Sequence, residues 1–87
     1  MGNKKNIMQL EIITPQQIIF SGEVSAITLT GEAGLFTILE NHAPIISTLV
    51  KGKIMYRTAE KENFLEISGG FVEANDNKIN LCVEVQE

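Results

Sequence analysis

The sequence predicts an all-β fold, either a sandwich or a small barrel, formed by a single domain. Short segments in which apolar and polar residues alternate recur along the 87 residues, and turn-forming residues separate them. No segment has a convincing helical pattern, because residues 57–66, which have some helical propensity, form too short a stretch between two strong strands. The length is also below that of a common domain. We therefore expect a flexible leader at residues 1–7 and one β-sandwich domain at residues 8–87.

The first expected strands form a hairpin-like pair. Residues 8–13 alternate between apolar and polar side chains, so this strand has one wet face. Residues 14–15 (Thr-Pro) interrupt it, and the apolar run at residues 18–20 resumes extended structure. We expect a turn at residues 21–22 (Ser-Gly) before the next strand begins.

The middle of the chain reverses direction and then crosses between sheets. Residues 24–30 are rich in β-branched side chains, and Gly31 and Gly34 bracket a sharp turn after them. Residues 36–39 resume extended structure, and an apolar segment follows at residues 43–49. A proline within this last segment is acceptable at a strand start or edge but not in a central ladder. The segment is therefore expected to begin where the chain passes to the second sheet.

The second half of the chain continues the pattern. Strands are expected at residues 53–58, 64–68, 71–73 and 79–85, joined by turns at residues 59–63, 69–70 and 75–77. The last strand is the clearest, because apolar residues stand at every second position from Ile79 to Val85. Cys82 lies in this strand and is expected to be a small core or near-core residue.

Composition and charge narrow the possible functions. The chain has 44% hydrophobic and 21% charged residues and a net charge of −4, with acidic and basic residues scattered along it. Nucleic-acid binding is disfavoured, because it needs a concentrated positive surface that neutralises phosphates. No apolar run is long enough to cross a bilayer, and no secretion signal is present, so the protein is expected in the cytoplasm.

Catalytic and cofactor-binding patterns are missing from the sequence. The only histidine, His42, has no cysteine, aspartate or second histidine near it at metal-ligand spacing. A serine or cysteine nucleophile would need the same histidine as its base, yet no nucleophile-elbow pattern is present. The glycines do not form a phosphate-binding or dinucleotide-binding motif. We therefore expect no enzymatic activity, no cofactor and no metal.

Three segments, in order and covering nearly the whole chain, indicate a family. They are LEIITPQQIIFSGEV (Leu10 to Val24), the region from Gly34 to Leu49 with NHAPIIS at its centre, and ISGGFVEANDNKINL (Ile67 to Leu81). With these segments the chain resembles the N-terminal domain of the epsilon subunit of F-type ATP synthase, which is similar to the mitochondrial delta subunit.

The resemblance implies a ten-stranded β-sandwich and a role without catalysis. In this family the domain lies at the foot of the central stalk and binds the gamma subunit on one side and the ring of c subunits on another. It fastens the rotor, so that proton-driven rotation of the ring reaches the catalytic head. The implied location is the cytoplasmic face of the bacterial inner membrane, held peripherally, without insertion into the bilayer and without nucleic acid as a partner.

The resemblance also implies partner-binding residues. It places Thr14 and the turn at residues 31–35 toward the ring, and His42 and Ser47 nearer the gamma subunit. The expected partner-binding residues are Thr14, Gly31, Glu32, Gly34, Leu35, Asn41, His42, Pro44 and Ser47. For His42 the alternative is that it caps a turn or satisfies a backbone group, and for Thr14 that it is only a turn residue before the proline.

Departures from the family leave further alternatives. Leu35 stands where the family usually has an acidic residue, so either Glu32 supplies the charge to the ring or the contact is apolar. Family members commonly continue into an inhibitory C-terminal helical hairpin, whereas this sequence stops at Glu87, as a naturally short version or as part of a longer chain. The inhibitory function is therefore not assigned to these residues.

Two other classes of protein fit a short all-β chain. An oligonucleotide-binding barrel, or another all-β binding module, is the alternative, although such barrels rely on a basic groove and aromatic platforms. A lipoyl or biotin carrier would present a modified lysine at a hairpin tip, and Lys53 lacks the flanking pattern.

Overall fold

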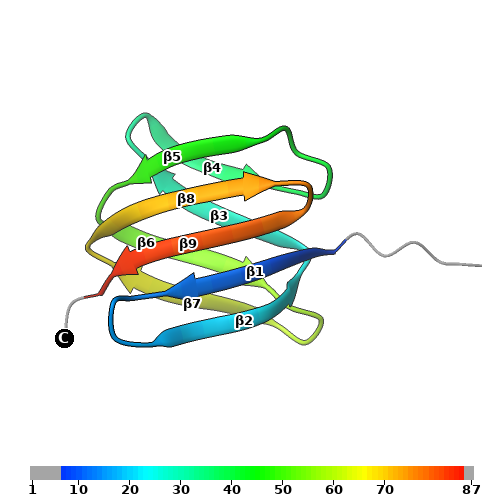
Figure 1. The fold of residues 1–87 in the computed structure, drawn as a ribbon, viewed down its shortest axis with the longest axis horizontal. Helices are drawn as coiled ribbons and strands as arrows, with labels where there is room; N and C mark the ends of the chain where they lie inside the picture. The colour runs from blue at the N-terminus through cyan, green and yellow to red at the C-terminus, as the bar shows by residue number, and fades with distance from the viewer. Residues whose placement is uncertain (1–6, 86–87) are drawn as a thin grey trace, which may run out of the picture.

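Residues 7–85, which are those described in the computed structural model, form two packed β-sheets (Figure 1). Nine strands are found in this range, close to the expected ten, and the prediction of an all-β sandwich is confirmed. The strands are β1 (Met8–Ile13), β2 (Ile18–Val24), β3 (Ala26–Gly31), β4 (Gly34–Ile38), β5 (Ile45–Leu49), β6 (Gly52–Arg57), β7 (Glu62–Ile67), β8 (Gly69–Asn75) and β9 (Lys78–Glu84). Most of the predicted leader, residues 1–6, lies outside the described range.

The two sheets differ in size and are joined by four connections along the chain. One sheet has five strands in the order β2-β1-β9-β8-β5, and the other has four in the order β4-β3-β6-β7. Neighbouring strands are antiparallel except β1 and β9, which run parallel. The chain changes sheets four times: at Ser25 between β2 and β3, then between β4 and β5, between β5 and β6, and between β7 and β8. The second change confirms the predicted crossing before residues 45–49.

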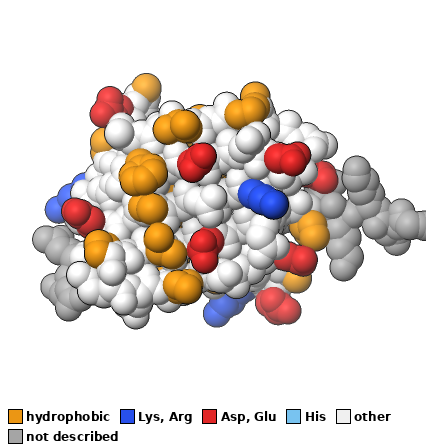
Figure 2. Space-filling model, viewed as in Figure 1, with side chains coloured by type: hydrophobic (Ala, Val, Ile, Leu, Met, Phe, Trp, Pro, Cys, Tyr) orange, Lys and Arg blue, Asp and Glu red, His pale blue; other side chains and the backbone are white. Residues whose placement is uncertain are grey.

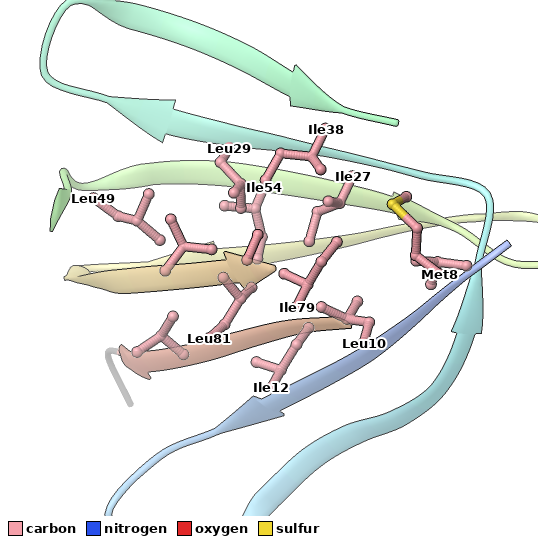
Figure 3. Packing of buried hydrophobic residues seen from close by; sticks show 14 of the residues in the cluster. Met8, Leu10, Ile12, Ile27, Leu29, Ile38, Leu49, Ile54, Ile79 and Leu81 are labelled. Carbon is pink, nitrogen blue, oxygen red and sulfur yellow. The ribbon is translucent and has the colours of Figure 1, made fainter. Parts of the chain in front are cut away.

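The core lies between the inner faces of the sheets (Figure 3). Side chains of successive strand residues point to opposite faces, so every second residue of a strand enters the core. The central strands β1 and β9 supply six of the buried residues: Met8, Leu10, Ile12, Ile79, Leu81 and Val83. The facing sheet supplies Ile27, Leu29 and Ile54, all fully buried. Burying each such side chain contributes about 1.5–3 kcal/mol relative to leaving it in water.

The predicted turn at residues 21–22 is wrong, because β2 runs through both residues. The turn lies earlier, at residues 14–17, where the amide of Thr14 donates to the carbonyl of Gln17 at 2.9 Å. Gly22 has a packing role within the strand instead. A Cβ at this position would lie 3.1 Å from Cζ of Phe20, whose ring packs against Tyr56 with centroids 4.6 Å apart. The glycine therefore leaves room for the Phe20 ring. From the sequence alone, a glycine with this packing role looks the same as a glycine in a turn.

The other predicted hairpins are confirmed. Residues 31–34 close the β3–β4 hairpin, and residues 58–61 close the β6–β7 hairpin, where a hairpin was expected in place of a helix. Asp76 and Asn77 form the turn between β8 and β9 with φ angles of 57° and 63°. Two consecutive residues with positive φ are what a tight hairpin turn requires.

These connections gather at two opposite ends of the sandwich. The hairpin end, at the left in Figure 1, contains the β1–β2 turn, the β3–β4 hairpin and the β5–β6 connection. The asparagine end, at the right, contains residues 39–44 and the turns at residues 58–61 and 76–77. With strands of five to seven residues that rise about 3.3 Å per residue, the two ends are roughly 20 Å apart.

Candidate partner-binding surfaces

At the hairpin end, Thr14 stabilises the turn that follows β1. The side chain is buried, and its Oγ1 accepts hydrogen bonds from the amides of Gln16 and Gln17, each at 3.2 Å. The hydroxyl is thus occupied within its own turn, as the turn-residue alternative expects. Exposed atoms at this corner come from Pro15, Gln16 and Gln17. A role of Thr14 in binding the ring stays a prediction.

The β3–β4 hairpin exposes a leucine, and its one carboxylate is hydrogen-bonded to the neighbouring strand β5. Leu35 is 71% exposed, whereas Oε2 of Glu32 accepts a hydrogen bond from Oγ1 of Thr48 on β5 at 3.2 Å. Gly31 pairs with Gly34 at the tip of the hairpin. A Cβ at Gly31 would lie 3.0 Å from the carbonyl oxygen of Gly34, so the tip is closely packed. This arrangement favours the alternative in which a contact at this hairpin is apolar.

The Thr14 turn and the Leu35 hairpin lie at the same end but at opposite edges. The turn follows β1 beside the edge strand β2, and the hairpin contains the edge strand β4 of the other sheet (Figure 1). Thr30 stabilises the hairpin end, because its backbone carbonyl oxygen accepts a hydrogen bond from the backbone amide of Val50 at 2.8 Å. Its Oγ1 also donates to the Val50 carbonyl at 2.6 Å. These bonds join β3 to the β5–β6 connection next to the hairpin.

At the asparagine end, two asparagine residues join separate loops. The amide of Asn41 donates to Oδ1 of Asn77 at 2.7 Å, and Nδ2 of Asn77 lies 3.3 Å from Oδ1 of Asn41. Asn41 has a φ of 66°, a left-handed conformation that asparagine tolerates better than most residues. Asn41 thus joins residues 39–44 to the β8–β9 turn, and its expected role in partner binding stays a prediction.

His42 and Pro44 lie exposed in the same loop, and Ser47 lies further along. The amide of His42 donates to the carbonyl of Leu39 at 3.1 Å, and its Nδ1 is 2.8 Å from the carbonyl oxygen of Ala43. The histidine thus closes its own turn, as one of the two alternatives expects, while its ring stays accessible. Pro44 directly precedes β5, and Ser47 is a half-buried residue of that strand.

A row of apolar residues on the outer face of the five-stranded sheet was missed from the sequence. Strand register places Ile13 opposite both Ile18 and Cys82, and Cys82 opposite Phe71. Paired residues share a face of the sheet, so these four side chains form a line across four strands, which we call the apolar row. In Figure 2 hydrophobic side chains gather in such a line near the hairpin end. The signal in the sequence was an apolar residue at outward positions of strands that otherwise alternate.

The described residues contain few groups that could form a catalytic or metal-binding site. No three histidine, cysteine, aspartate or glutamate residues between positions 7 and 85 lie close enough to hold a metal ion. Within this range every buried side-chain nitrogen or oxygen has a hydrogen-bond partner. Burial raises the pKa of the Tyr56 phenol above its ordinary value of 10.0, but this ring packs against Phe20 within the sandwich. The described part of the chain contains no helix that is long and apolar enough to span a membrane.

Exposed apolar side chains at both ends and on the outer faces define a small β-sandwich of the kind that is found as a subunit of larger assemblies. Residues 7–87 match the family described as the β-sandwich domain of the ATP synthase delta/epsilon chain. The chain therefore belongs to this family, and the resemblance noted in the sequence is confirmed.

Relatives with the same description differ in length. The ATP synthase epsilon chain of Chlorobium limicola is 39% identical over 85 residues, which are 97% of each chain. The epsilon chain of Leptospira interrogans is also 39% identical, over 79 residues, which are 91% of this chain but 62% of the relative. The chain thus spans less than two thirds of some relatives and nearly all of others.

Solved structures share the fold. A chain in the cryo-EM structure of the Euglena gracilis mitochondrial ATP synthase, which contains OSCP, F1 and the c-ring, has a TM-score of 0.85 and 25% identity. The match covers 94% of this chain and 53% of that one. A chain in the central stalk and c-ring structure of the Tetrahymena thermophila enzyme has a TM-score of 0.75 and 20% identity, covering 94% and 66%.

Proposed function

We propose that the chain is a non-catalytic subunit of the central stalk of an F-type ATP synthase. It joins the gamma subunit to the ring of c subunits and so couples proton translocation to ATP synthesis. The observation that carries this proposal is the family match over residues 7–87, together with a relative of the same length that is named as an ATP synthase epsilon chain.

The geometry suits a subunit that contacts two partners at once. The expected ring-binding residues lie at the hairpin end, and those expected to bind the gamma subunit lie at the asparagine end or along β5. A two-sheet core of strands joined by hydrogen bonds separates these ends and resists bending. Torque applied at one end is therefore transmitted to the other.

The ring contact is proposed to depend on Leu35 and not on a carboxylate. Leu35 projects from the hairpin, and Glu32, the acid nearest to it in the sequence, is hydrogen-bonded to Thr48. The chain carries no chemical step and binds no cofactor in this proposal. Its partners hold it at the cytoplasmic face of the bacterial inner membrane, without insertion into the bilayer.

Binding to the gamma subunit is the direct test. Purified chain and gamma subunit from the same organism are mixed at micromolar concentration and separated by size-exclusion chromatography. A co-eluting complex of the two proteins is expected, and separate elution would count strongly against the proposal. A second sample contains the detergent-solubilised c-ring, where Leu35→Lys should weaken ring binding while co-elution with the gamma subunit persists.

The alternative of an oligonucleotide-binding barrel does not fit the observed topology. Two sheets of five and four strands face each other across one core, whereas such barrels close five strands on themselves.

A further inference from the structure

We propose that Glu32 and Thr48 are positioning residues for the ring contact. The hydrogen bond between their side chains fixes the β3–β4 hairpin against β5 and so holds Leu35 in the orientation that binds the ring. This inference rests on the proposed function and deepens it. It assigns a role to Thr48, which was not among the residues expected from the sequence, and it gives Glu32 a role that does not need its charge at the ring.

The hairpin is attached to the neighbouring chain at two points. At its base, Thr30 bonds to Val50 through its backbone carbonyl oxygen at 2.8 Å and through its hydroxyl at 2.6 Å. At its tip, Oε2 of Glu32 accepts a hydrogen bond from Oγ1 of Thr48 at 3.2 Å. Figure 1 shows the hairpin beside the end of β5, the strand that carries Thr48. Two attachments together restrain a rotation about the base that one attachment alone would allow.

Leu35 lies beside both attachments. In the register of β3 and β4 it is paired with Thr30, and Gly31 is paired with Gly34 one position nearer the tip. Glu32 follows Gly31, so the second attachment is close to the pair that contains Leu35. Because the leucine side chain is mostly exposed, packing within the chain does little to fix it. Its orientation therefore depends on how the hairpin backbone is held.

The tip of the hairpin is exposed and has a flexible backbone position. Glu32, Ala33 and Gly34 are all exposed. Gly34 has a φ of 130°, and a Cβ there would meet nothing within 4 Å. Glycine adopts such angles readily, and a segment with few buried contacts opens at a low cost in free energy. A hydrogen bond from the tip to β5 therefore has a large effect on how often the hairpin takes one orientation.

A restrained hairpin binds its partner more tightly than a mobile one. A loop that already has its bound conformation loses less conformational entropy when it binds. The apparent affinity rises with the fraction of free chains in the binding-competent conformation. The Glu32–Thr48 bond raises this fraction without touching the ring itself.

The same bond connects the two surfaces that the proposed function assigns to different partners. Thr48 follows Ser47, which is expected to contact the gamma subunit, and both belong to β5. The hairpin that carries Leu35 is thus attached directly to this strand. A force that the ring applies to the hairpin would pass into β5 through the bond as well as through the base of the hairpin.

The competing role for Glu32 is a direct charge contact with the ring. Such a contact needs the ionised carboxylate, whereas the bond to Thr48 needs only an oxygen that accepts from a hydroxyl. Glu32→Gln separates the two roles, because the amide oxygen of glutamine still accepts a hydrogen bond after the charge is lost.

The test measures the affinity of variants of the full chain for the detergent-solubilised c-ring by biolayer interferometry. Glu32→Ala and Thr48→Val should each weaken binding about three- to tenfold, as expected for the loss of one hydrogen bond. Glu32→Gln and Thr48→Ser keep an acceptor and a donor, so they should stay within about twofold of the unmodified chain. The matched control is Thr28→Val, which removes the 2.9 Å bond to Thr37 in the same hairpin and should also stay within about twofold.

Two further readouts report on the bond itself. The double variant Glu32→Ala, Thr48→Val should bind about as weakly as either single variant, because both substitutions remove the same interaction. Amide hydrogen exchange at residues 31–35 of the free chain should be faster in Thr48→Val and unchanged in Thr48→Ser.

The outcomes separate the inference from the proposed function. If the unmodified chain does not bind the ring, the proposed ring contact fails and this inference fails with it. If the unmodified chain binds and Glu32→Gln weakens binding as much as Glu32→Ala, the glutamate supplies a charge and only the inference is overturned. Additive losses in the double variant, or hydrogen exchange that Thr48→Val leaves unchanged, would also overturn it.

Discussion

Replacing Gly70 by alanine should lower the free energy of unfolding by about 2–5 kcal/mol. This loss is larger than that expected for a glycine that is needed only for the backbone angles of a turn. Gly70 has a φ of 151°, and an alanine Cβ there would overlap the carbonyl oxygen of Cys82 and lie 2.8 Å from Cα of Val83. Ordinary contacts begin at 3.4 Å, so β8 must move away from β9 by more than half an ångström. Backbone strain alone costs about 1–3 kcal/mol, and disturbing the ladder hydrogen bonds adds about 1 kcal/mol for each bond lost.

The matched control is Gly34→Ala in the β3–β4 hairpin. Gly34 also has a positive φ, 130°, but nothing lies within 4 Å of a Cβ at that position. Its substitution should therefore cost only the strain, about 1–3 kcal/mol. Urea denaturation followed by circular dichroism gives both free energies of unfolding. Equal losses for the two variants would refute the argument that the close approach of β8 and β9 requires Gly70.

Three further predictions concern the core and its edges. Thr30→Val should lower the free energy of unfolding by about 1–2 kcal/mol, because it removes the bond to Val50, while Thr28→Val, whose hydroxyl bonds at the surface, should cost less in the same urea titration. Leu81→Ala should cost about 2–5 kcal/mol, since the side chain is fully buried, and a loss below 1 kcal/mol would contradict the placement of the core. Burial raises the pKa of the Tyr56 phenol in the folded protein above its ordinary value of 10.0. The stability that the neutral phenol contributes is therefore present below pH 10 and is lost as the pH rises through the pKa of the folded state. Above pH 10 the melting temperature of Tyr56→Phe should fall less steeply than that of the unmodified chain.

Local patterns predicted most of the strands. The alternation from Ile79 to Val85 corresponds to β9, whose buried residues are Ile79, Leu81 and Val83. Gly31 and Gly34, together with the Asp76 turn, were recognised because tight turns need residues that tolerate unusual backbone angles. The crossing before β5 was predictable because a proline is excluded from a central ladder.

Features that depend on distant parts of the chain could not be predicted from local patterns. The parallel pairing of β1 with β9 joins residues about 70 positions apart. Gly22 was misread as a turn because its role is to leave space for the Phe20 ring. The hydrogen bond between Glu32 and Thr48 also joins the β3–β4 turn to a strand of the other sheet, β5, so the sequence left the charge of the hairpin open.

The apolar row was missed for the same physical reason. Its members come from four strands and become neighbours only through the register of the folded sheet. Each of them alone is an exposed or half-buried apolar residue, which is common on protein surfaces.

Coupled ATP synthesis tests most directly the proposal that the chain fastens the rotor of an ATP synthase. Inverted membrane vesicles from the source organism are depleted of the epsilon chain, and ATP synthesis is driven by an imposed proton gradient. Adding the purified chain is predicted to restore synthesis. Vesicles that synthesise ATP equally well with and without the chain would contradict the account.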